Sequence, residues 1–138
     1  MQARLQSLLD ENLFRVESAG LERKSLGRHR VHPSVVSCMQ KRGIDIGKHQ
    51  SHYIARLHHL EDYSIFVCVT RDVAERVQRI LTEIKHSALV IVANDVRGGL
   101  EDPHEAVESV EACACLIDEV SPGIADKIRS YVETQSQR

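Results

Sequence analysis

Tryptophan is absent from this 138-residue chain, and aromatic residues make up 4% of it. Proteins that bind single-stranded nucleic acids usually stack the bases on aromatic side chains, so such a platform is not expected. Neither sign of charge predominates, because 18 lysines and arginines stand against 20 acidic residues, for a formal net charge of −2. A dedicated nucleic-acid binder normally carries a basic excess, so we expect no nucleic-acid partner.

Long apolar runs and secretory features are also missing. No apolar stretch approaches the roughly 18 residues that a membrane-spanning helix needs. The opening residues, MQARLQSLLDEN, lack the apolar core and small-residue cleavage site of a secretory signal. We therefore expect no membrane association and a cytoplasmic location. In such a chain the four cysteines indicate free thiols rather than a disulfide framework.

The composition is that of an ordinary globular protein, with 42% hydrophobic and 28% charged residues. The length suits a single domain over residues 1–138, and no internal repeat, low-complexity tract or linker interrupts it.

Hydrophobic spacing predicts helices that alternate with strands. We expect strands over 14–18, 63–69 and 88–93, the last two continuously apolar as in strands covered on both faces. We expect helices over 2–13 and 33–42, a short helix before Asp62, and a long helix capped by Thr70. A loop over 94–103 precedes a helix from 104 to about 120, which Ser121-Pro122-Gly123 interrupts before it resumes over 124–132. This alternation predicts an α/β fold of three layers, a parallel sheet with helices on both faces.

Ligands of open parallel sheets bind beyond the carboxyl ends of the strands, and here the loops 19–32, 70–72 and 94–103 leave those ends. In the third loop, Asp102 precedes Pro103 and follows two glycines. Two interpretations stay open. Asp102 either caps the helix that follows, or it is a general acid that reaches over a site.

Other residue types that could carry chemistry have weak signals. None of the cysteines has the glycine-rich turn and following arginine that activate a nucleophile, and Cys113-Ala114-Cys115 has poor spacing for chelation on a helix. The eight histidines show no spacing typical of a zinc site. We expect no metal and no cofactor. A basic cluster within 23–30 is either an anion-attracting patch or an ordinary solvated surface.

Five segments in order are similar to the low-molecular-weight protein-tyrosine-phosphatase family. They are Val-Glu-Ser-Ala-Gly at 16–20, Lys-Arg-Gly-Ile-Asp-Ile at 41–46, His-Gln-Ser-His at 49–52, Ile-Phe-Val-Cys-Val-Thr at 65–70, and Asp-Pro at 102–103. The resemblance covers nearly the whole chain. It implies a phosphomonoester hydrolase that works through a phosphocysteine, with phosphorylated proteins or small phosphoesters as substrates.

By the same resemblance, Asp102 is the general acid that protonates the leaving oxygen, and Ser18 and His49 support the phosphate loop. His52 stands where the family usually has arginine. The family's first strand and its Cys-x5-Arg loop have no counterpart, because Met1-Gln2-Ala3 matches the opening of the helix that follows that loop. The chain is therefore expected to be an N-terminally truncated version of the domain.

We expect these residues alone to be inactive as a phosphatase, since the nucleophile and the anion clamp are both missing. A non-catalytic interaction or regulatory domain on the same fold is the alternative. A relative of the thioredoxin-coupled arsenate reductases is less favoured, because no cysteine occurs over 70–85. The absent strand would lie between the 14–18 and 63–69 strands. Either these two edges pair directly, or a second chain completes the sheet, for example as a homodimer through the exposed strand edges.

Overall fold

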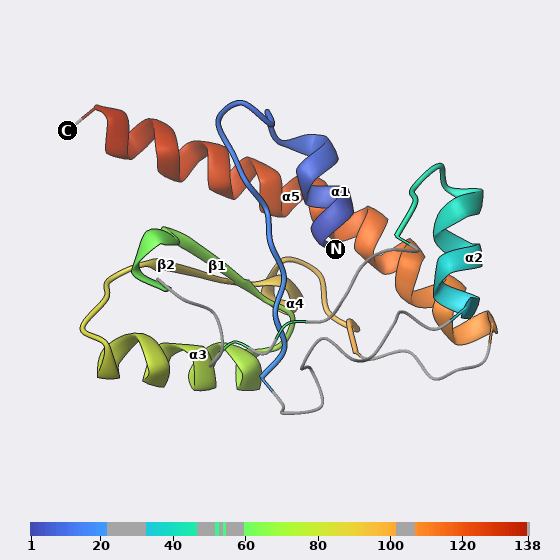
Figure 1. Cartoon of the computed structure of the whole chain (residues 1–138), viewed down its shortest axis with the longest axis horizontal. Coiled ribbons are helices and arrows are strands. Elements are labelled where there is room, and N and C mark those ends of the chain that lie inside the picture. The colour runs from blue at the N-terminus through green and yellow to red at the C-terminus, as the bar shows by residue number, and fades with distance from the viewer. Residues whose placement is uncertain (22–32, 47–51, 53, 55–59, 102–106, 138) are drawn as a thin grey trace.

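The computed structural model describes residues 1–21, 33–46, 52, 54, 60–101 and 107–137, and Figure 1 shows how their helices and strands are arranged. In chain order the elements are α1 (Gln2–Leu8), α2 (Pro33–Lys41), the 3-10 helix η3 (Leu60–Asp62), β1 (Ile65–Cys68), α3 (Arg71–Glu83), β2 (Leu89–Val92), α4 (Ala93–Val96) and α5 (Val107–Ser136). None of these helices is long and apolar enough to cross a membrane.

The two strands form a parallel sheet in which Ile65 lies opposite Leu89 and Cys68 lies opposite Val92. Both apolar runs expected as strands are therefore strands, each slightly shorter than predicted. Within the described residues the sheet contains β1 and β2 only. Direct pairing between 14–18 and 63–69, one of the two expected arrangements, is thus not present in this part of the chain.

Helices cover both faces of this sheet, as the continuously apolar strands predict. Side chains alternate between the faces, so Ile65, Val67 and Ile91 pack in the cluster that also contains residues of α1 and α5. Phe66 and Cys68 pack on the other face, in the cluster formed by α3. The three-layer arrangement is visible in Figure 1, where α5 and α3 lie on opposite sides of the strands.

Helix α3 begins and packs as its sequence predicts. The Thr70 hydroxyl accepts a hydrogen bond from the Val73 N–H at 3.3 Å, which satisfies one of the free donors of the first turn. Ala74, Val77 and Leu81 recur at helical spacing and are buried against the sheet. This helix carries the chain from the end of β1 to the start of β2, as parallel pairing requires.

The strand predicted over 14–18 is wrong, because side chains of α1 take the hydrogen bonds that a neighbouring strand would make. The Gln6 amide accepts from the Val16 N–H at 2.8 Å and donates to the Phe14 carbonyl at 3.1 Å. The Gln2 amide donates to the Val16 carbonyl at 3.2 Å. These glutamines are one helical turn apart, so both face the same segment.

Helix α1 ends at Leu8, and not at residue 13 as the hydrophobic spacing predicts. Leu9 has an extended backbone, and the Asp10 carbonyl then accepts from the N–H groups of Leu13 and Phe14 at 3.0 and 2.8 Å. The Asp10 carboxylate accepts from the Asn12 N–H at 2.9 Å, which is the competing bond that makes aspartate a turn residue. Leu13 consequently points outward and is 76% exposed.

The interruption predicted at Ser121-Pro122-Gly123 is also wrong, since α5 continues through it. Pro122 is exposed, while Val120 and Ile124 on the buried side are 0% exposed. A proline inside a helix costs about 3 kcal/mol, but each large apolar side chain that is fully buried contributes about 1.5–3 kcal/mol. Packing of the buried side therefore outweighs the loss at proline.

Candidate functional site

The amino-terminal end of α1 is where the predicted support residue Ser18 lies. Its hydroxyl donates to the Gln2 side-chain oxygen at 2.5 Å, and Ser18 is half-buried there. Gln2 thereby links the end of the 14–18 segment to the first turn of α1. Neither Gln2 nor Gln6 is among the residues predicted to be functional, although two glutamines four apart on the polar side of a helix are a recognisable signal.

The loop that leads to the predicted acid is fixed by Asn94. Its side-chain amide donates to the Leu100 carbonyl at 2.9 Å and accepts from the Leu100 N–H at 2.8 Å. The sequence predicts a loop from Asn94 onward, but Asn94 lies within the single helical turn α4. Leu100 is 3% exposed. The chain is thus anchored two residues before Asp102.

Several predicted residues lie outside the described residues. Asp102, the expected general acid, and His49, the expected support, are both in this group, as is the basic cluster within 23–30. Their roles therefore stay predictions. The choice between Asp102 as a helix cap and Asp102 as a general acid stays open for the same reason. His52 is described and is exposed.

An ionic cluster ties α1 and α2 to α5. The Asp118 carboxylate of α5 accepts from Arg4 at 2.9 Å and also pairs with Arg42, which follows α2. Arg42 further reaches the Glu111 carboxylate at 3.5 Å and the Cys115 sulfur at 3.4 Å. Contacts with the Cys115 and Cys38 thiols, followed by the charge of Asp118, raise the pKa of Arg42 above its usual value.

Arg42 is poorly available to bind a phosphate, because carboxylates of α5 already engage it. A guanidinium that already faces carboxylates on α5 offers little to a phosphate, because each donor directed at Asp118 or Glu111 is occupied. Arg42 therefore serves as a structural clamp between α2 and α5. The sequence predicts only that Arg42 lies at the end of a helix, because Glu111 and Asp118 become its neighbours only through folding.

The thiols are not arranged as a phosphatase nucleophile. Cys68 is buried within β1, and burial raises the pKa of its thiol to about 11, so the reactive thiolate is scarce. Cys38 is buried as well, whereas Cys115 is exposed. The residues six positions after the four cysteines are Ile44, Ala74, Glu119 and Ser121, so no cysteine is followed by arginine at the spacing of a phosphate loop. Among the described residues, no group of three or more His, Cys, Asp or Glu side chains could hold a metal ion.

Known structures resemble the chain over most of its length. Wzb of Vibrio vulnificus, solved with benzylphosphonate, matches with a TM-score of 0.74 and 22% identity, over 91% of this chain and 86% of that one. The tyrosine phosphatase Wzb from Escherichia coli K30, solved with sulphate, matches with a TM-score of 0.74 and 19% identity, over 92% and 86%. A mutant of YwlE from Bacillus subtilis matches with a TM-score of 0.69 and 14% identity, over 93% and 87%.

The chain has the fold of the low-molecular-weight tyrosine phosphatases. No protein-family model and no curated protein matches its sequence. At identities of 14–22% the likeness establishes the fold alone. The resemblance identified from five short segments is thus confirmed as a likeness of fold.

Proposed function

We propose that this chain is the scaffold of a low-molecular-weight tyrosine phosphatase, that it carries the general acid of phosphomonoester hydrolysis, and that these 138 residues do not complete the reaction unaided. Asp102 is the acid, and Ser18 and His49 support the phosphate site. The fold shared with a tyrosine phosphatase supports the reaction class, together with the phosphonate and the sulphate held by the two Wzb structures.

The observation that carries this proposal is the lack of any thiol followed by arginine at the required spacing. Cys68 is buried with a raised pKa, and Arg42 is engaged by Asp118 and Glu111. A phosphate dianion needs several N–H donors and a guanidinium fork, and a thiolate must attack in line with the leaving oxygen. Removal of a nucleophile in a well-studied hydrolase cost about 10⁶ in turnover, so useful hydrolysis by the chain alone is not expected.

The complete reaction assigns Asp102 a proton in each half. In the first half, a thiolate forms a bond to phosphorus, the phosphorus–oxygen bond to the leaving group breaks, and the carboxyl of Asp102 gives its proton to that oxygen. In the second half, water attacks phosphorus, its proton returns to Asp102, and the sulfur–phosphorus bond breaks to release inorganic phosphate. Asp102 supplies acid and base, and the thiolate and guanidinium must come from added residues.

A graft experiment tests the scaffold directly. A five-residue apolar strand followed by Cys-x5-Arg-Ser is joined ahead of Met1, and hydrolysis of para-nitrophenyl phosphate is measured for the grafted and original chains. The graft is expected to hydrolyse the ester and the original chain is not. Asp102→Asn in the graft should lower kcat by about 10²–10⁴. Glu101→Gln, one residue away, is the matched control and should change kcat little.

Two results would contradict the proposal. Turnover by the original chain that disappears with Asp102→Asn would show that it needs no added nucleophile. A grafted chain that folds and binds phosphate but hydrolyses nothing would show that the scaffold does not place an acid. Its circular dichroism and phosphate titration separate that case from simple misfolding.

A non-catalytic interaction domain is the second candidate, and the open sheet edges favour it. The Leu89 N–H donates to the Ser64 carbonyl at 3.0 Å, so by alternation the backbone groups of Ile65 and Val67 point away from β2. No partner for them occurs in the described part of the chain. The unpaired N–H and C=O groups of such an edge can bond to a strand of another chain.

Completion of the sheet by a second copy, as a homodimer through β1, is proposed on this basis. Sedimentation equilibrium is expected to show a dimer, which Val67→Pro should dissociate because it removes one outward N–H. The grafted chain should be monomeric, since its added strand occupies the same edge. A wild-type chain that is monomeric at all concentrations would contradict this arrangement.

The hypothesis of an arsenate reductase gains no support, because Cys68 lies inside β1 and α3 contains no cysteine.

A further inference from the structure

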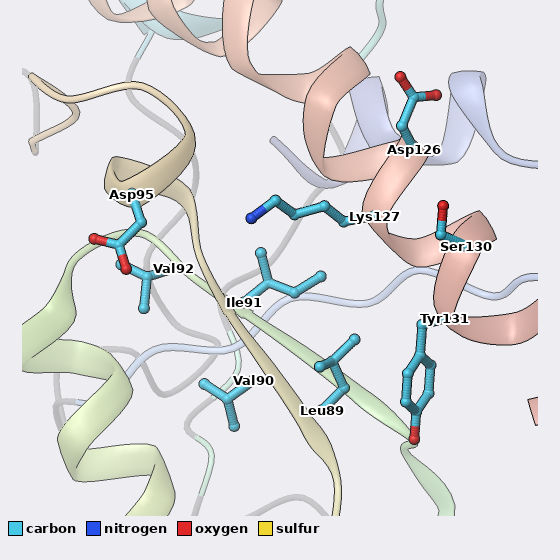
Figure 2. Close-up of a pocket in the computed structure, with 9 residues that line it drawn as sticks. All are labelled: Leu89, Val90, Ile91, Val92, Asp95, Asp126, Lys127, Ser130 and Tyr131. Atoms are coloured by element: carbon cyan, nitrogen blue, oxygen red, sulfur yellow. The ribbon is translucent and has the colours of Figure 1, made fainter. Parts of the chain in front are cut away.

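A groove of about 530 Å³ follows the outer edge of β2, on the side away from β1. Figure 2 shows its lining, which comprises the four strand residues Leu89–Val92, Asp95, and four residues of α5 (Asp126, Lys127, Ser130 and Tyr131). Side chains of a strand alternate between the two faces, so a surface that touches four consecutive residues must run along the edge. The groove therefore exposes backbone as well as side chains.

The register of the sheet identifies which backbone groups are available. Because the Leu89 N–H donates to the Ser64 carbonyl, Leu89 and Ile91 direct their backbone groups toward β1. The N–H and C=O groups of Val90 and Val92 point to the opposite side, into the groove. In the ranges that the structure describes, no segment pairs with this edge.

The charges around the groove determine what kind of segment fits. The Asp95 carboxylate accepts from Arg71 at 3.0 and 3.1 Å, and the Asp126 carboxylate accepts from Arg129 at 2.8 Å. Both acids are thus already neutralised. Lys127 has no carboxylate partner among the described residues, and Figure 2 shows its ammonium extending toward the Asp95 end of the groove. The uncompensated charge is positive.

We propose that the edge of β2 binds an extended apolar segment of a partner protein that carries one acidic side chain opposite Lys127. Its backbone bonds to Val90 and Val92, as in other cases of strand addition, and its carboxylate pairs with the lysine. Tyr131 lies at the Leu89 end and offers an aromatic surface there. A second copy of the chain fits less well, because β2 has the sequence Leu-Val-Ile-Val and brings no carboxylate of its own.

A charge-reversal experiment tests the lysine contact. The probe is a fluorescein-labelled, end-capped peptide of alternating threonine and valine that ends in aspartate. A second peptide of the same sequence ends in lysine instead. Binding of each peptide is measured by fluorescence polarisation. The wild-type chain is expected to prefer the aspartate peptide by about fivefold. Lys127→Glu should reverse that preference. Lys41→Glu is the control and should leave the preference unchanged, because Lys41 is an exposed residue of α2 that does not line the groove. Reversal itself demonstrates that the variant is folded.

The backbone contacts are tested with two N-methylated forms of the aspartate peptide. Methylation of the amides that face β2 should abolish binding, and methylation of the alternate set should not. The proposal fails if Lys127→Glu leaves the preference unchanged, or if both methylated peptides bind as the parent does. It also fails if the wild-type chain binds neither peptide because a second copy covers the edge of β2. In that case Val90→Pro would dissociate the dimer, and Val67→Pro would leave it intact.

Discussion

The side chain of Gln6 makes two hydrogen bonds to the 14–18 segment, and its oxygen accepts from the Val16 N–H at 2.8 Å while its nitrogen donates to the Phe14 carbonyl at 3.1 Å. The side-chain amide of Gln6 thus bonds one backbone N–H and one backbone C=O, two residues apart, as a neighbouring strand would. The segment that follows α1 is extended yet needs no neighbouring strand at these positions.

Gln6→Ala tests this relationship. The substitution leaves the N–H and C=O that Gln6 bonded without partners in a half-buried position, so the free energy of unfolding is expected to fall by about 1–3 kcal/mol. Urea denaturation measures the change. Gln78→Ala in α3 is the matched control, because Gln78 is exposed and alanine favours the helix. Equal stability of the two variants would show that the amide contributes nothing.

A side chain at Gly123 is expected to destabilise the protein, because it would meet a neighbouring helix. A Cβ at this position would lie 2.9 Å from the Val96 Cγ1, where α5 crosses α4. Gly123→Ala should therefore lower the free energy of unfolding by about 1–3 kcal/mol, despite the better helix propensity of alanine. Gly98→Ala is the control, since the nearest atom there is 4.0 Å away. Adding Val96→Ala should recover part of the loss in a double-mutant cycle, and additive losses would refute the contact.

Asn94 is expected to fix the loop that precedes Asp102. Asn94→Ala removes both hydrogen bonds to Leu100 and should lower the free energy of unfolding by about 1–3 kcal/mol. In the grafted phosphatase it should also lower kcat more than it lowers phosphate affinity, because the acid is displaced and the phosphate loop is not. A variant with reduced stability and unchanged kcat would limit the role of Asn94 to folding.

Alkaline pH is expected to destabilise the protein through Cys68. Burial raises the pKa of its thiol from 9.0 to about 11, so between these values the unfolded chain loses a proton that the folded chain keeps. The free energy of unfolding therefore falls as pH rises through this window, by about 2–3 kcal/mol in total, and the loss is absent below pH 9. A hydrogen bond to Glu17 and burial raise the pKa of Tyr63, which adds to the loss at higher pH.

The measurement compares the wild-type chain with Cys68→Ala in urea at pH 8 and at pH 10.5. The variant should be less stable at pH 8, because a buried side chain is truncated, but it should lose less stability on going to the higher pH. Tyr63 is present in both proteins and cancels in the comparison. Parallel losses in the two proteins would show that Cys68 does not titrate as described.

The sequence by itself determined the parts of the fold that depend on local pattern. The apolar runs around Phe66 and Val90 became strands, and Thr70 with the spacing of Ala74, Val77 and Leu81 specified α3. Each of these signals is satisfied within a few residues, by alternation, by helical spacing or by a cap. The five segments that resembled the phosphatase family also identified the overall fold.

Only the tertiary structure decided the outcomes that depend on distant neighbours. The 14–18 segment is not a strand because α1 satisfies its backbone, and α5 passes through Pro122 because burial of Val120 and Ile124 outweighs the local cost. Arg42 became a clamp because Asp118 and Glu111, about 70 residues further on, fold against it. These interactions join groups far apart in the chain, and their free energies exceed the local preferences that a sequence pattern expresses.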